Sequence, residues 1–97
     1  MNVNIKEEVK EIKKSIISNR RDFHKYPELG FKEIRTSKII AQKLSSYGLD
    51  VQTGVGKTGV VATLTGNADG KTIALRADMD ALPIQETGDL PFKSVHD

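Results

Sequence analysis

The chain has 97 residues, of which 15 are Lys or Arg and 13 are Asp or Glu, so its formal net charge is +2. Such a small charge does not indicate a polyanion such as nucleic acid as a partner. Hydrophobic residues make up 37% and charged residues 29% of the chain, which excludes a typical disordered composition. At this length one domain is the maximum, so we expect a single domain over residues 1–97.

The absence of cysteine narrows the chemistry that these residues can supply. It excludes a disulfide, a thiolate nucleophile and a cysteine-ligated zinc site within the 97 residues. Residues 1–7 lack the apolar stretch of a signal peptide, and no apolar run approaches the roughly 18 residues that cross a membrane. We therefore expect a cytoplasmic protein with no membrane partner.

Two helices are predicted in the first half of the chain. Apolar residues spaced by 4, 3 and 4 positions predict an amphipathic helix over roughly residues 4–24. Pro27 ends it, because the residue before a proline is pushed out of the helical region. A second apolar pattern predicts a helix over residues 34–47, with Gly48 in the left-handed position that often follows a helix.

The second half of the chain changes to a strand-type pattern. Residues 60–64 and 72–76 are short β-type runs joined by a turn cluster at 66–71, which predicts an antiparallel pair. Residues 51–53 are expected to form a third, short strand. The fold class is therefore α/β, with two N-terminal helices followed by a small antiparallel β-hairpin or a three-stranded sheet. One helical layer covers only one sheet face, so we expect these elements to belong to a larger domain.

Residues 54–59 spell the glycine pattern of a dinucleotide-binding loop. Phosphate binding in such loops requires a helix to begin directly after the glycines, whereas residues 60–64 are strand-forming. A Walker A loop would need glycine at Val51, and a kinase loop would need lysine where the next strand has Arg76. We therefore interpret residues 54–59 as a turn between strands.

Asp78 and Asp80 are the candidate site residues. They follow an apolar run, and because side chains alternate along a strand, both carboxylates are expected on the same side. Two close like charges need a cation or a hydrogen-bond donor, such as a metal, an imidazole or Arg76. The alternative is a solvated strand end in which Arg76 forms an ion pair.

The two histidines, His24 and His96, are isolated in the sequence. No pair of histidines or cysteines has the spacing of a zinc site, so none is expected from these residues alone. His24 falls at the end of the first predicted helix, where a partly cationic imidazole interacts favourably with the helix dipole.

Four stretches of the chain together resemble a known family. They are residues 20–31, Glu33 with Arg35 and Thr36, residues 58–61 and residues 74–86. In this order they resemble the amidohydrolase branch of the aminoacylase and carboxypeptidase-G type zinc peptidases, which includes hippurate hydrolase and the indole-acetyl-amino-acid hydrolases.

The resemblance implies the N-terminal part of an α/β/α, di-metal exopeptidase-like catalytic domain. The whole enzyme would be a cytoplasmic homo-oligomer that hydrolyses small N-acyl amino acids with two divalent metal ions, zinc or manganese, and a glutamate base. In this branch the metal ligands come from a Cys-Gly-His-Asp-Gly-His stretch and from later glutamates and histidines. Residues 94–97 resemble the lead-in to that stretch. We therefore expect these 97 residues to be an incomplete domain, to bind no metal and to be inactive alone.

The family pattern also suggests roles for single residues. Asp80 matches an aspartate that orients a metal-bound histidine from behind in the wider family. Asp78 occupies the position of a ligand histidine in that wider family, and Pro83 fits the turn of the same motif. His24 and Glu28 belong to a family signature and are expected to serve loop and helix-end structure. No metal ligand is expected in this chain.

A second hypothesis from another class stays open. The chain could be a self-contained small module for binding or assembly, without catalysis. That hypothesis predicts a stable monomer with a cooperative unfolding transition, whereas an incomplete domain should self-associate through open edges and faces.

Overall fold

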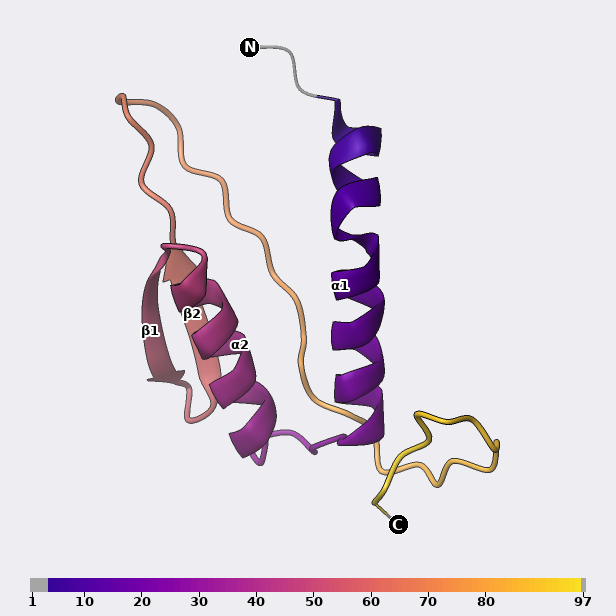
Figure 1. Cartoon of the computed structure of the whole chain (residues 1–97). Coiled ribbons are helices and arrows are strands. Elements are labelled where there is room, and N and C mark those ends of the chain that lie inside the picture. Colours follow the sequence, from indigo (N-terminus) through magenta and orange to yellow (C-terminus); the bar gives the residue numbers. More distant parts are fainter. Residues whose placement is uncertain (1–3, 97) are drawn as a thin grey trace. The chain divides into compact units, whose positions relative to one another are not determined.

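The computed structural model describes residues 4–96. Its elements are α1 (Ile5–Lys25), α2 (Ile34–Ser46), β1 (Asp50–Val55) and β2 (Gly59–Thr63), in that order (Figure 1). The described chain divides into two compact units, one of residues 4–27 with 84–96, and one of residues 28–83. The fold class predicted from the sequence is confirmed, since two helices are followed by an antiparallel two-stranded sheet.

Helix α1 belongs to the first unit and agrees with the predicted helix to within one residue at each end. The side chain of Asn4 caps its start by accepting a hydrogen bond from the Glu7 amide at 3.3 Å. The helix ends at Lys25, and Tyr26 before Pro27 leaves the helical region with φ −121° and ψ 65°. Among the described residues, no helix is long and apolar enough to cross a lipid bilayer.

Helix α2 belongs to the second unit, and its end confirms the role expected for Gly48. This glycine has φ +85°, in the left-handed region that a side chain disfavours. The following amide, of Leu49, donates to the carbonyl oxygen of Leu44 at 3.3 Å. This bond satisfies one of the carbonyl groups that have no partner within the last turn of the helix.

Strands β1 and β2 form an antiparallel hairpin in the second unit. Asp50 lies opposite Thr63, and Val55 lies opposite Gly59, with an irregularity in the register between Gln52 and Val55. The turn predicted over the glycine pattern is confirmed, because residues 54–59 close this hairpin and a strand follows them.

The predicted pairing of residues 60–64 with 72–76 is wrong. The partner of β2 is β1, which includes the short strand expected at 51–53, and residues 72–76 form no strand. The glycine turn brings β1 and β2 together over a very short loop, at a low entropic cost of closure. In contrast, Ile73 and Leu75 are 87% and 96% exposed, so no burial stabilises their segment.

The described residues bury no hydrophobic side chain. The buried side chains are polar, those of Glu33, Thr36 and Thr58, while large apolar side chains on both helices and in the segment after β2 are exposed. Burial of apolar surface is the main favourable contribution to folding. The architecture therefore presents faces that further protein has to cover.

Candidate functional site

The structure places Asp78 at the surface. One of its carboxylate oxygens lies 3.2 Å from Nη2 of Arg76, and the two side chains are 73% and 90% exposed. This is the ion pair considered as the alternative from the sequence. A pair this exposed contributes little to stability, because water and salt screen it.

Asp80 lies beside the loop that precedes α2. The amide of the next residue, Ala81, donates to the carbonyl oxygen of Glu28 at 2.7 Å, which ties the two segments together. A Cβ atom added to Gly30 would meet Oδ2 of Asp80 at 3.7 Å. Asp80 also lines a shallow hollow with Glu33 and Thr58. Asp80 is exposed like Asp78, but it lies next to Gly30 and the loop before α2, whereas the contact of Asp78 is with Arg76.

The residues present do not form a metal centre. Within residues 4–96, no three His, Cys, Asp or Glu side chains come together in a way that could hold a metal ion. A centre with two divalent ions needs a larger set of ligands than this. We therefore derive no catalytic step through a metal from the side chains of this chain.

Glu28 stabilises the start of α2. Its carboxylate accepts a hydrogen bond from the amide of Thr36 at 2.6 Å and another from the amide of Arg35 at 3.1 Å. Glu33, at the N-cap position itself, makes no capping bond through its side chain. Burial raises the pKa of the Glu28 carboxyl, but the amide hydrogen bonds from Thr36 and Arg35 outweigh it and lower the pKa overall. Glu28 thus has the helix-end role expected from the sequence.

Replacement of this cap should weaken α2. We expect Glu28→Ala to cost about 1 kcal/mol, as the loss of a helix cap usually does. Hydrogen exchange at the Thr36 amide should become faster, while Glu11→Ala on the exposed face of α1 should leave it unchanged. Unchanged protection of Thr36 in Glu28→Ala would show that Glu28 is not the cap.

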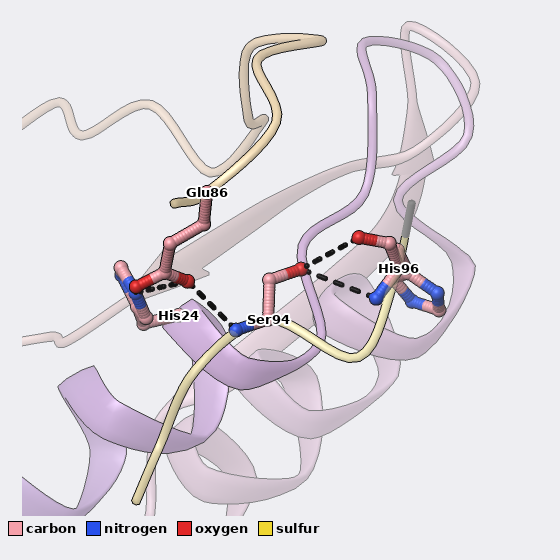
Figure 2. Close-up of polar contacts among 4 residues, drawn as sticks. All are labelled: His24, Glu86, Ser94 and His96. Carbon is pink, nitrogen blue, oxygen red and sulfur yellow. Dashed lines mark hydrogen bonds and ion pairs between the residues drawn. The ribbon is translucent and has the colours of Figure 1, made fainter. Parts of the chain in front are cut away.

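A second polar cluster lies in the first unit, where Glu86 joins α1 to the segment of residues 84–96 (Figure 2). Nε2 of His24 lies 3.1 Å from Oε1 and 3.0 Å from Oε2 of Glu86. The amide of Ser94 donates to Oε1 of the same carboxylate at 2.7 Å. The Ser94 hydroxyl in turn accepts from the amide of His96 at 3.2 Å. One carboxylate therefore connects the end of a helix with a segment that has no regular structure.

Two further contacts surround this cluster. The rings of Phe92 and His24 are nearly perpendicular, with centroids 5.7 Å apart, and the Arg21 guanidinium lies 4.6 Å from the Phe92 centroid. The Val95 amide donates to the carbonyl oxygen of Lys25 at 2.9 Å. That bond satisfies one of the carbonyl groups left open at the end of α1.

The amide of Ser94 and the ring of His24 lower the pKa of the Glu86 carboxyl, with a smaller contribution from the charge of Lys93. A carboxyl whose pKa is lower in the folded state contributes stability above its unfolded pKa of about 4.3, and that contribution is lost as the pH falls through the folded value. We therefore expect the Ser94 amide to be protected from exchange at neutral pH and to lose that protection on acidification, once the Glu86 carboxyl becomes protonated.

A carbon-detected NMR titration of the Glu86 carboxyl provides the check. Its midpoint should fall below the ordinary value of a glutamate carboxyl, and His24→Ala should move it upward. A midpoint at the ordinary value would contradict the effect of Ser94 and His24.

Sequence reasoning did not find Glu86 as a partner of His24. The two residues are 62 positions apart, and no spacing rule connects them. The one sequence feature that connects them is that both belong to the stretches on which the family resemblance rests. That signal identified the residues as members of a pattern and not as neighbours in space.

Comparison of the sequence and the fold with known proteins shows which proteins this chain is similar to. No family model matches the chain. It is 54% identical over 91 residues to thermostable carboxypeptidase 2 of Saccharolobus solfataricus, an alignment that covers 93% of this chain and 23% of the carboxypeptidase. It is 57% identical over 76 residues to the hippurate hydrolase of Campylobacter jejuni, covering 77% of this chain and 20% of that enzyme. The crystal structure of Bacillus subtilis YXEP, described as a dinuclear metal-binding peptidase of the M20 family, superimposes with a TM-score of 0.83 at 45% identity.

By sequence and fold, the chain is similar to one part of the M20-family peptidase YXEP and of the hydrolases named above. The superposition on YXEP covers 91% of this chain and 25% of that protein, and the chain spans about a quarter of the length of its curated relatives. The family resemblance predicted from the motifs is confirmed. The expectation that the helices and the hairpin belong to a larger domain is confirmed as well.

Proposed function

We propose that the chain is part of the catalytic domain of a metal-dependent amidohydrolase that cleaves N-acyl amino acids. The observation that supports this proposal is that the names of several relatives indicate the same type of substrate bond. Hippurate hydrolase, N-acetylcysteine deacetylase of Bacillus subtilis (48% identical) and N-acyl-L-amino acid amidohydrolase of Geobacillus stearothermophilus (43% identical) all imply an amide between an acyl group and an amino acid.

The whole enzyme would use two divalent metal ions, zinc or manganese, to activate water and to polarise the amide carbonyl. YXEP, the structural relative, is described as binding two metals. The 97 residues contain no cysteine and two histidines, so the expected ligands must come from other parts of the enzyme. We propose that this chain binds no catalytic metal by itself and is inactive alone.

Within this proposal, Asp80 has the role of orienting a metal-bound histidine, and Asp78 is a surface residue paired with Arg76 that takes no direct part in the chemistry. The position of Asp80 beside the loop before α2 and its place in the hollow with Glu33 favour the first assignment. The exposed ion pair of Asp78 with Arg76 favours the second.

The proposal also covers the cellular location, the oligomeric state and the partners of the whole enzyme. It would be a cytoplasmic homo-oligomer that acts on a small-molecule substrate, with no nucleic-acid or membrane partner. Residues 1–97 would form one incomplete domain of it. The near-balanced charge of the chain supports the exclusion of nucleic acid.

A chimera tests the proposed function. This chain would replace the matching segment of the Campylobacter jejuni hippurate hydrolase, and release of glycine from hippurate would be measured together with the metal content. We expect activity within about tenfold of the parent enzyme, because 57% identity preserves the packing surfaces. A folded, metal-loaded chimera without hydrolysis would overturn the proposal.

The same chimera tests Asp80. We expect Asp80→Asn to lower metal affinity or kcat by about 10-fold to 100-fold, the usual effect of removing a group that orients a metal ligand. Asp69→Asn, in the exposed turn after β2, is the matched control and should change neither quantity. If Asp80→Asn behaves like Asp69→Asn, Asp80 does not orient a ligand.

A further inference from the structure

The contacts of residues 92–96 converge on the last turn of α1. His24 reaches Glu86, the Lys25 carbonyl accepts from Val95, and Arg21 lies over the ring of Phe92. These contacts differ in kind, since they include a charge-assisted hydrogen bond, a backbone hydrogen bond and a cation–π contact. Together they fix both the position and the direction of the segment.

Glu86 is the centre of this arrangement. Its side chain is 20% exposed, and it uses Oε1 for the Ser94 amide while both oxygens lie within 3.1 Å of His24. The seven residues between Glu86 and Ser94 thereby form a closed loop. Residues 84–96 contain no helix or strand, so side-chain contacts replace a hydrogen-bonded ladder in ordering them.

We propose that His24 and Glu86 are positioning residues that hold residues 92–96 against the end of α1. This inference rests on the proposed function, because residues 94–97 resemble the lead-in to the metal-ligand stretch of the whole enzyme. Fixing Ser94 and Val95 sets the point and the direction from which that stretch enters the active site. Neither His24 nor Glu86 touches the metals or the substrate in this assignment.

The chemistry of the pair explains why these two residue types are suited to the task. A carboxylate accepts several hydrogen bonds at once, from a backbone amide and from an imidazole, and a glutamine offers one acceptor oxygen only. Glu86→Gln should therefore retain the Ser94 bond and weaken the His24 contact. Glu86→Ala should lose both.

The test measures kcat, KM and metal affinity in the hippurate hydrolase chimera that carries Glu86→Ala, Glu86→Gln or His24→Ala. We expect Glu86→Ala to lower kcat or metal affinity at least tenfold while KM changes less than twofold, and Glu86→Gln to lie between it and the unmodified chimera. Asp89→Asn, an exposed change in the same loop, is the control.

Hydrogen exchange at Ser94 and Val95 separates the two proposals. Faster exchange in Glu86→Ala with unchanged kcat and metal affinity would overturn the positioning role. An inactive unmodified chimera would count against the proposed function alone, and exchange in the folded chimera would then decide on the contact itself. Protection of Ser94 that is lost in the Glu86→Ala chimera would support the contact, and equal exchange in both chimeras would overturn it.

Discussion

Replacement of Gly59 by alanine is expected to abolish the β1–β2 hairpin. Gly59 lies opposite Val55 in the register, and a Cβ atom at position 59 would overlap with the carbonyl oxygen of Val55. The obstacle is backbone, so no side-chain rotation relieves it. Overpacking of this kind costs about 1–3 kcal/mol, and a two-stranded hairpin is marginally stable to begin with.

The measurement is the set of cross-strand NOEs between the Cα protons of paired residues, above all Gln52 and Val61. They should disappear in Gly59→Ala. The matched control is Gly66→Ala, where an added Cβ meets no atom within 4 Å and the NOEs should persist. Persistence of the NOEs in Gly59→Ala would show that the turn can adopt another register.

The isolated chain is expected to self-associate. No hydrophobic side chain is buried among the described residues, and Ile73 and Leu75 are exposed almost completely. Patches of this kind are covered by a partner or by further chain in stable proteins. Sedimentation should show an average mass that rises with concentration in the micromolar range, without a cooperative unfolding transition.

A double change in the exposed segment tests the cause. Ile73→Ser with Leu75→Ser should shift the sedimentation profile toward monomer, because it removes the two most exposed large apolar side chains. Thr72→Ser with Ala74→Ser, in the same segment, should not. A monomer with a sharp unfolding transition in the unmodified chain would instead support a self-contained module.

Local patterns in the sequence predicted the local structure well. The apolar spacing from Ile5 to Ile16 requires one helix face, and Pro27 limits where that helix can end. Gly48, Gly54 and Gly56 have positive φ angles that few other residues tolerate. Each of these features depends on neighbours within a few positions, so a single sequence is enough to find it.

Non-local choices were harder to predict. Residues 72–76 have the composition of a strand, but composition does not say which strand is the partner, and the tight glycine turn favours β1. The contact between His24 and Glu86 spans 62 positions and became visible only in three dimensions. The Arg76 ion pair with Asp78 was foreseen as one of two alternatives, because its two members are close in sequence.

The candidate site shows the same difference between local features, which the sequence predicts, and non-local ones, which it does not. Asp78 and Asp80 were chosen because alternation along a strand would place them on one side, but their segment forms no strand, and their surroundings differ. The family pattern distinguishes the two aspartates better than strand alternation does, since it assigns an orienting role to Asp80 alone. Their roles stay predictions until the chimera is measured.

We propose that this chain supplies part of the scaffold of a two-metal amidohydrolase and none of its metal ligands. The most direct test is the metal content of the 97-residue chain after equilibration with Zn²⁺ or Mn²⁺ and desalting, measured by mass spectrometry. We expect fewer than about one metal ion per ten chains, because tight binding requires a convergent set of deprotonated ligands. One or two ions per chain that survive desalting and a competing chelator would contradict the claim.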